Sequence, residues 1–342
     1  MLFGRDLGID LGTTNVLISV RNKGVILREP SVVAIDKTAG KLLNVGMAAQ
    51  RMLGRTPGNI AAILPIRGGA ITDYDMSERL LGELVRKISS FSLLKPRMII
   101  AVSSGISEVE ERAVIDVGIS AGARKVYLLE SPVAAAYGAG LDISKPDGHL
   151  VIDIGGGAVD IAVLSLSGVV ESASSKDGGD AFNDAIIKYI RRKNNILIGD
   201  STAEELKKSI GCVFPRTDSA AVEVKGRCLV TGLPKVVTVT TSDMLDAFEE
   251  VTQRIIDLLQ SVLENTPPEL VADISRNGIV LTGGGSLVWG LDKLIESSTS
   301  IPTRIADDAD KCVAYGLSKA LSSIESMPEG TINLSRRRQM KK

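Results

Sequence analysis

Two short segments of this chain repeat one another. The segment LGIDLGTT at residues 7–14 matches LVIDIGGG at residues 150–157, with an aspartate and a glycine aligned in both. Each segment is followed by a second apolar stretch that is rich in β-branched residues. The pattern predicts a strand, a tight Asp-x-Gly turn and a second strand, used twice. A duplicated two-domain architecture follows, and 342 residues are enough for two domains.

Predicted strands alternate with predicted helices along the rest of the chain, which is typical of an α/β protein. We expect strands at 26–35, 97–102, 125–129 and 278–281, a strand pair at 229–241, and helices at 76–91, 108–121, 133–138, 181–193, 202–210, 244–264 and 313–324. The expected first domain spans 1–145 with a small insertion at about 33–65, and the second spans 146–325 with an insertion at about 182–243. The last helix is expected to pack back on the first domain, before a basic tail at 326–342.

Composition excludes several classes of function. Lys and Arg number 40 against 41 Asp and Glu, and aromatic residues make up 3%, so we expect no nucleic-acid partner. Three cysteines without a C-x-x-C pair and a single histidine argue against a disulfide framework or a zinc site. No apolar run is long enough to span a bilayer, and the first residues do not read as a signal peptide. These features suit a protein of the reducing cytosol.

Three glycine turns carry the candidate chemistry, each after an apolar strand. Without a Cβ, glycine lets backbone N–H groups converge on an anion such as phosphate, and neighbouring threonines add hydroxyl donors. Asp10 and Asp153 repel phosphate, but they suit the waters of a Mg²⁺ ion. Two facing turns of this kind predict a clamp for a Mg-nucleotide, whereas a single turn would more often be an ordinary hairpin. Neither a P-loop nor a Rossmann motif is present.

The segments around these turns resemble the actin-like ATPase superfamily, and most closely the MreB family of bacterial actins. The resemblance runs from about residue 6 to 322 and includes IDLGTTN, EPSVVAID, LESPVAAAYG and VLTGGGSL. It implies an actin-like (RNase H-like) duplicated fold with a nucleotide cleft between the domains. It also implies ATP and Mg as cofactors and head-to-tail filaments of the chain itself.

The resemblance assigns roles to individual residues. It implies a first phosphate loop at Gly12, Thr13, Thr14 and Asn15, and a second at Gly155, Gly156 and Gly157. It implies that the purine side is lined by Gly283, Gly284, Gly285 and Ser286, and that Mg is held through water by Asp10 and Asp153. Glu204 and Lys207 resemble the pair that contacts the ribose and base, and their spacing puts both on one helix face. The same spacing is equally natural for a surface ion pair.

Two departures from the family pattern concern hydrolysis. The family has Glu-Glu-Pro where this chain has Glu130-Ser131-Pro132, so the water-positioning residue is replaced by Ser131. After the second loop the family has Thr-Thr-Glu, but here Asp160 follows Ala158 and a valine. The candidate catalytic residues are therefore Asp160, Asp153 and the degenerate Ser131. Because a positioned base contributes about 10²–10⁴ in rate, we expect a weak ATPase at most.

Two apolar features are candidates for a membrane contact: Leu2-Phe3 at the start and Leu93-Leu94 before a Lys-Pro pair. From the residues alone, Leu93 and Leu94 are expected to form the end of a core helix. The resemblance instead favours a loop that contacts the membrane. The expected location is cytoplasmic, peripheral on the inner face of the cytoplasmic membrane. Expected partners are further copies of the chain and cell-wall synthesis or morphogenesis proteins.

Three other functions remain open at this point. A small-molecule kinase of the same superfamily would need an Asp general base, for which Asp73 and Asp75 are the nearest candidates. A chaperone ATPase is disfavoured because no substrate-binding segment follows the last predicted helix. A scaffold or regulator of other MreB-like filaments, which binds ATP without hydrolysing it, is compatible with Ser131 and Ala158.

Overall fold

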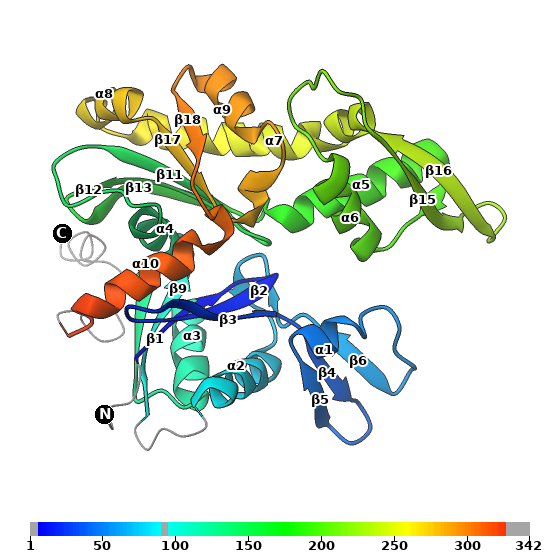
Figure 1. Cartoon of the computed structure of the whole chain (residues 1–342), viewed down its shortest axis with the longest axis horizontal. Helices are drawn as coiled ribbons and strands as arrows, with labels where there is room; N and C mark the ends of the chain where they lie inside the picture. The colour runs from blue at the N-terminus through cyan, green and yellow to red at the C-terminus, as the bar shows by residue number, and fades with distance from the viewer. Residues whose placement is uncertain (1–5, 90–94, 326–342) are drawn as a thin grey trace.

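Two five-stranded sheets form the frame of the molecule, one above the other in Figure 1. The computed structural model describes residues 6–89 and 95–325. The first sheet has the order β10-β9-β1-β2-β3, and its strands are β1 (Leu7–Leu11), β2 (Asn15–Val20), β3 (Gly24–Pro30), β9 (Arg97–Val102) and β10 (Lys125–Glu130). The second has the order β13-β12-β11-β17-β18, and its strands are β11 (His149–Ile154), β12 (Val159–Ser165), β13 (Gly168–Ser175), β17 (Ile279–Thr282) and β18 (Thr303–Ile305).

Both sheets have the same topology. In each, three antiparallel strands (β1-β2-β3 and β11-β12-β13) are extended by two parallel strands on the side of the first strand. The short repeat in the sequence is therefore the visible part of a repeat of two whole sheets. The predicted duplicated α/β fold is confirmed.

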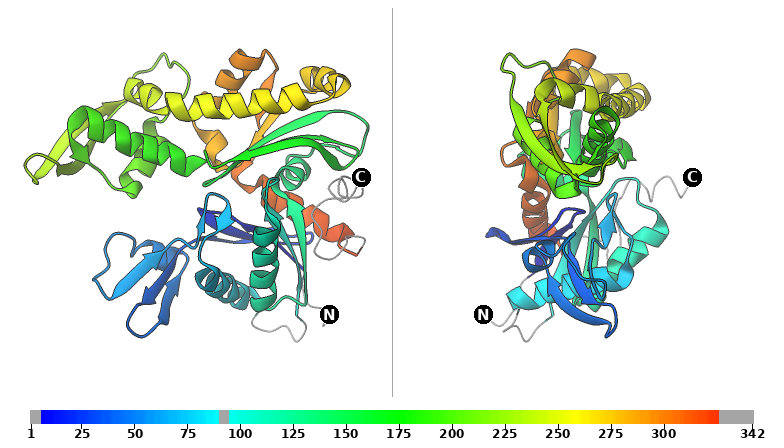
Figure 2. Two further views of the ribbon diagram at one scale, coloured as in Figure 1. Left: turned by 180° about the vertical axis from the view of Figure 1, so that it is seen from behind. Right: turned by 90° about the vertical axis from the view of Figure 1, so that its right-hand side faces the viewer.

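Strand residues alternate between two different cores, as expected when successive side chains point to opposite faces. In β9, Met98 and Ile100 join the core of the first half, where they pack with α2 (Tyr74–Ser89) and α3 (Glu108–Ser120). Helices α2 and α3 lie side by side on that face (Figure 2). Ser107 and Glu110 form a reciprocal capping box that fixes where α3 begins.

The second half has an equivalent core on the outer face of its sheet. Its helices are α5 (Gly179–Asn194), α6 (Asp200–Ile210), α7 (Thr241–Asn265), α8 (Pro268–Asn277) and α9 (Leu291–Thr299). Phe182 of α5 and Phe248 of α7 are fully buried and meet edge to face, with ring centroids 4.9 Å apart. This contact fixes α5 against the long helix α7.

A third core joins the two halves. The inner faces of both sheets pack on α4 (Ser131–Gly138) and α10 (Cys312–Ala320), which cross between them. Gly316 allows this approach, because a Cβ there would lie 1.7 Å from the backbone oxygen of Ala134. Ser318 Oγ donates to the backbone oxygen of Val20 at 2.9 Å, and Lys319 Nζ donates to that of Tyr137 at 2.6 Å. The last helix thus packs against the first half of the chain.

Small sheets extend from each half on the same side of the molecule (Figure 1). The first half carries β4 (Val33–Asp36), β5 (Lys41–Val45), β6 (Ile60–Ile63) and the short helix α1 (Met47–Gln50), followed by the hairpin of β7 (Ile66–Arg67) and β8 (Ala70–Ile71). The second half carries β14 (Ile196–Leu197), β15 (Ala221–Cys228) and β16 (Pro234–Thr240). Within the described ranges, no helix is both long and apolar enough to span a membrane.

Several sequence predictions of elements were wrong. The single strand expected at 26–35 is two strands in different sheets, because the chain turns at Pro30 and Ser31. At this turn the Ser31 hydroxyl donates a hydrogen bond to the backbone oxygen of Gly12 at 2.6 Å. The hairpin or strand pair expected at 229–241 is a hairpin, but it spans 221–240, with its turn at 229–233. The closing helix ends at Ala320 and continues as a 3₁₀ turn, Leu321–Ser323. Helices α8 and α9 were not predicted.

Candidate functional site: a cleft between two glycine turns

A cavity of about 650 Å³ lies between the two halves of the molecule. Residues of both glycine turns line it, together with side chains of α6 and the third glycine turn. The predicted site residues that it brings together are Asp10, Gly12, Thr13, Thr14, Asn15, Asp153, Gly155, Gly156, Glu204, Lys207, Gly283, Gly284 and Gly285. A set of residues spread over most of the chain thus meets in one cleft.

The two repeated turns have the same hydrogen bond. Gly12 N donates to Asn15 O at 3.1 Å, and Gly155 N donates to Ala158 O at 2.8 Å. The turns also touch each other across the cleft, since a Cβ on Gly156 would lie 1.9 Å from Thr14 Oγ1. A larger residue there would have to displace the Thr14 side chain, so the arrangement favours glycine. The two turns are therefore close enough to hold one ligand between them.

The threonines of the first turn differ in their surroundings. Thr13 is buried, and its Oγ1 accepts a hydrogen bond from Gly69 N in the β7–β8 hairpin at 3.1 Å. A Cβ on Gly157 would lie 2.3 Å from the same oxygen. Thr14 is exposed and lines the cleft. Thr14 is thus the hydroxyl best placed to reach a ligand, while Thr13 also ties the turn to the hairpin.

Asp10 and Asp153 form the acidic floor of the cleft. Burial raises the pKa of Asp10 to about 7, against the opposing charge of Arg28. Burial and the charges of Asp160 and Asp10 raise the pKa of Asp153 to about 7, although Thr282 Oγ1 donates to Asp153 Oδ1 at 2.8 Å. Asp153 is buried and Asp10 is partly exposed to the cleft, and two such carboxyl groups with raised pKa values make a site whose charge a divalent ion would neutralise.

The donor set fits Mg²⁺ bound through water. In the described part of the chain, no three His, Cys, Asp or Glu side chains gather into a direct metal cage. Mg²⁺ keeps several of its waters and needs only one or two carboxylates when phosphate oxygens complete its shell. Asp10 and Asp153 supply that number of carboxylates beside the two phosphate-type turns.

Glu204 and Lys207 form a half-buried ion pair inside the cleft. Lys207 Nζ lies 2.7 Å from Glu204 Oε2 and donates to Gly179 O at 2.8 Å, and its side chain is 10% exposed. Asn183 Nδ2 and Lys208 Nζ also donate to Glu204, each at 2.9 Å. Burial alone would raise the pKa of Glu204, but these partners lower it to about 2. The pair is built into the cleft wall and is not an ordinary surface ion pair.

The third glycine turn packs against the end of β11. Gly283 has φ +80°, and a Cβ there would lie 2.3 Å from Ile154 O, so only glycine fits. Gly284 and Gly285 open on the cleft, but Ser286 is buried and its Oγ donates to Gly283 O at 2.7 Å. Ser286 therefore shapes the turn from behind.

Sequence reasoning missed the aromatic wall of the cleft. Trp289 lines it, with the Arg216 guanidinium 4.9 Å and Lys293 Nζ 4.5 Å from its ring centroid. Arg28 at the cleft is paired with Asp310 at 2.5 Å. One signal was available: the single tryptophan of the sequence stands three residues after Ser286 of the third turn.

Of the three candidate catalytic residues, Asp153 lines the cleft, whereas Ser131 and Asp160 do not. Ser131 is the first residue of α4 and follows the buried Glu130. Asp160 is buried on β12, directly opposite Asp153 of β11. Burial raises the pKa of Asp160, while hydrogen bonds from three serines oppose that rise. Among the described residues, Ser131, Gly157 and Asp160 are not part of the cavity lining.

The predicted membrane residues Leu2, Phe3, Leu93 and Leu94 lie outside the described residues. Helix α2 ends at Ser89, before the second of these segments.

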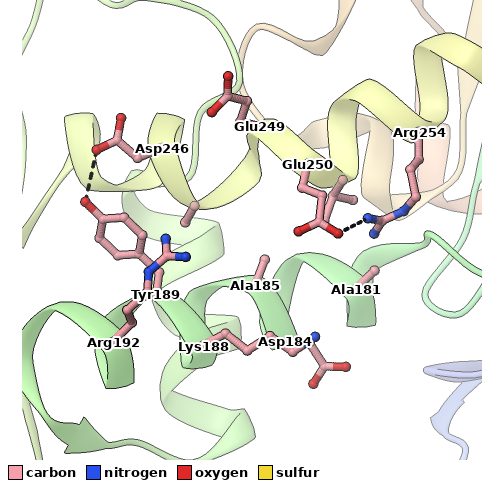
Figure 3. Close-up of a pocket in the computed structure, with 12 residues that line it drawn as sticks. Ala181, Asp184, Ala185, Lys188, Tyr189, Arg192, Asp246, Glu249, Glu250 and Arg254 are labelled. Atoms are coloured by element: carbon pink, nitrogen blue, oxygen red, sulfur yellow. Dashed lines mark hydrogen bonds and ion pairs between the residues drawn. The ribbon is translucent and has the colours of Figure 1, made fainter.

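A second cavity of about 400 Å³ lies between α5 and α7 (Figure 3). Ala181 and Ala185 leave room there, and charged side chains surround it. Two contacts link its lining residues: Tyr189 Oη donates to Asp246 at 3.0 Å, and Arg254 pairs with Glu250 at 2.8 Å. It shares no lining residue with the cleft between the turns. The cleft is therefore the better candidate for a nucleotide site.

Comparison with known proteins agrees with this geometry. The family model described as MreB/Mbl protein matches residues 4–329. Cell shape-determining protein Mbl of Bacillus cereus is 45% identical over 329 residues, which is 96% of this chain and 99% of that protein. Cell shape-determining protein MreB of Escherichia coli K12 is 46% identical over 330 residues, which is 95% of each chain.

Solved structures give the same result. The crystal structure of MreB5 of Spiroplasma citri bound to ADP has a TM-score of 0.90 at 37% identity, and covers 95% of this chain and 98% of its own. The MamK double helical filament has a TM-score of 0.79 at 21% identity, covering 95% and 99%, which supports the actin-like fold. This chain therefore belongs to the MreB/Mbl family of actin-like proteins.

Proposed function

We propose that this chain is an ATP-binding cytoskeletal protein that forms filaments at the inner face of the cytoplasmic membrane and directs cell shape. Cell-wall synthesis or morphogenesis proteins would be its partners there. The observation that carries the proposal is the pair of matching glycine turns, which touch across a cleft floored by Asp10 and Asp153. The relatives named above as cell shape-determining proteins support the biological part of it.

In this proposal the polyphosphate of ATP lies between the two turns. Backbone N–H groups and the Thr14 hydroxyl would donate to its oxygens, and Lys207 would add positive charge. A bound Mg²⁺, held through water by Asp10 and Asp153, would neutralise phosphate charge. The purine would lie against Gly284 and Gly285. MreB5 of Spiroplasma citri bound to AMPPNP, at 37% identity with a TM-score of 0.88, supports a nucleotide in this cleft.

Slow hydrolysis is the second part of the proposal. Ser131 offers a hydroxyl where an acid would orient the attacking water, and Ala158 offers no hydroxyl beside the second turn. Both oxygens of Asp160 already accept hydrogen bonds from protein groups. Because none of these three residues would give strong general-base assistance, the same observations also suit a scaffold that binds ATP without hydrolysing it.

Self-association is supported by an exposed apolar surface at the tip of the β15–β16 hairpin. Its residues Leu229, Val230, Leu233 and Val236 are 43–80% exposed. An apolar surface at the end of an arm suits a contact with another copy of the chain. A head-to-tail contact of this kind does not close on itself and so generates a filament.

Calorimetric titration of Mg-ATP tests the nucleotide site. We expect Asp10→Asn to weaken Mg-ATP binding by about 10–100-fold, because an amide holds the waters of a cation less well than a carboxylate. Asp147→Asn, at an exposed position outside the cleft, is the control and should bind as the unmodified protein does. Equal affinity in all three proteins would exclude Asp10 from the site, and no measurable binding in any would exclude ATP.

A further inference from the structure

A buried carboxylate holds the two halves of the molecule together behind the second turn. Asp160 belongs to β12 in the second half, whereas Ser103 and Ser104 follow β9 in the first. Ser103 Oγ donates to Asp160 Oδ2 at 3.1 Å, and Ser104 N donates to Asp160 Oδ1 at 3.2 Å. Ser174 Oγ on the neighbouring strand β13 also donates to Asp160 Oδ1. Two of the three donors therefore come from the other half.

Burial makes these hydrogen bonds important for holding the two halves together. Asp160 is 4% exposed and Ser104 is 6% exposed, so water does not readily replace either partner. A buried carboxylate that loses its donors bears a large desolvation cost. If the two halves separated at this point, Asp160 would keep only the donor on its own sheet. The closed arrangement of the halves is therefore favoured by this contact.

The contact also lies next to both nucleotide turns. Asp160 pairs across the sheet with Asp153, which lines the cleft. Ser104 Oγ donates to Glu130 Oε2 at 3.4 Å, and Glu130 immediately precedes Ser131 at the start of α4. A Cβ on Gly69 would lie 2.9 Å from Ala158 Cβ and 3.2 Å from Ser103 Oγ. Movement at this point would therefore shift the second turn relative to α4.

We propose that Asp160, Ser103 and Ser104 form an interdomain latch, which positions the second glycine turn against the first half of the molecule. Asp160 acts in it as a positioning residue, whose oxygens are used by the latch and not by an attacking water. The latch sets how far the two halves open, and through Ser104 it links the second turn to the start of α4. It acts in the protein alone and does not depend on whether the bound nucleotide is ATP.

Pulsed electron paramagnetic resonance tests the latch without nucleotide. Spin labels at Lys41→Cys and Lys235→Cys, exposed positions on the two small sheets, report the separation of the halves, while the native cysteines are buried. Ser103→Ala removes a donor from the other half, and we expect a broader distance distribution with a longer mean. Ser174→Ala removes a donor to the same carboxylate from within the same sheet, and we expect it to leave the distribution unchanged.

Two results would overturn the latch. One is a Ser103→Ala distribution that superimposes on that of the labelled parent. The other is a Ser174→Ala distribution that moves as far as that of Ser103→Ala, which would assign the effect to the local structure of β12. Thermal unfolding of each variant checks that it is folded, and Asp160→Asn serves as a second variant that keeps the size of the side chain while losing an acceptor oxygen. If the latch exists, Asp160→Asn should increase the mean distance between the labels at least as much as Ser103→Ala does.

Discussion

In the proposed function, Ser131 is the residue that most limits ATP hydrolysis. It begins α4 directly after Glu130, which is buried and accepts a hydrogen bond from Ser104. Glu130 therefore points into the protein, and its neighbour has a short neutral side chain. The remaining acid of the region, Asp160, accepts three hydrogen bonds from serines. On this proposal, the chain keeps both glycine turns but lacks an acid that is placed to orient the attacking water.

Restoring that acid should restore turnover. We expect Ser131→Glu to raise the rate of phosphate release by at least about 100-fold, because a positioned general base contributes about 10²–10⁴. Ser131→Gln has nearly the same shape without a base, and its rate should stay at the level of the parent. A stopped-flow phosphate assay with saturating Mg-ATP measures all three. Equal rates for the Glu and Gln variants would show that position 131 does not limit hydrolysis.

The sequence predicts the residues of the turns better than the residues that support them. Asp10, Asp153 and the glycines stand in a repeated motif, so their chemistry can be read from the order of residues. The latch residue Ser103 meets Asp160 only after folding, and no repeat marks its position. Trp289 is marked only by its short distance from the third motif, which does not show that it lines the cleft. Ser286 shows the opposite error, since it belongs to the third motif but faces away from the cleft.

At the scale of elements, the main surprise is the arm formed by β15 and β16. Its strand β15 has the burial pattern of an exposed ribbon, with half of its residues exposed, so it lacks the apolar run by which buried strands are recognised. The sequence prediction at 229–241 accordingly covers the turn and β16 of the hairpin but misses β15. Buried elements such as β9 were predicted at the correct residues, because Met98 to Val102 form a continuous apolar run.

The arm leads to a prediction about assembly. Val230 is 80% exposed at the hairpin tip, so Val230→Asp should leave thermal stability nearly unchanged. If the tip contacts another copy, the buried charge should abolish sedimenting polymer in Mg-ATP. Ser298→Asp adds the same charge at an exposed position of α9 and should sediment like the parent. Normal sedimentation of the Val230 variant would remove the tip from the contact.

The segment after α2 leads to a prediction about membranes. We expect Leu93→Ser combined with Leu94→Ser to abolish co-sedimentation with anionic liposomes. Each leucine contributes at most about 1.5–3 kcal/mol, so a filament must multiply the contact before it holds. Leu43→Ser, a partly exposed leucine on β5, is the control. Unchanged liposome binding by the double variant would assign the membrane contact to another surface, with Leu2 and Phe3 next to be tested.

At the scale of the whole molecule, the contacts that join the two halves include a shared core, the ion pair of Arg28 with Asp310 and the proposed latch. Helices α4 and α10 pack between the sheets, and Asp160 with Ser103 and Ser104 lies behind the second turn. A ligand held by both glycine turns would favour the closed arrangement, because its contacts are complete only when the turns face each other. A change in that arrangement would move the small sheets at the far end of each half, including the hairpin tip.

Electron microscopy of the purified protein on anionic liposomes tests this account most directly. The sample contains Mg-ATP, and a matched sample contains no nucleotide. The account predicts filaments lying on the lipid with Mg-ATP and bare liposomes without it. Bare liposomes in both samples, from protein that binds Mg-ATP by calorimetry, would contradict the proposal that this chain is a nucleotide-switched membrane filament.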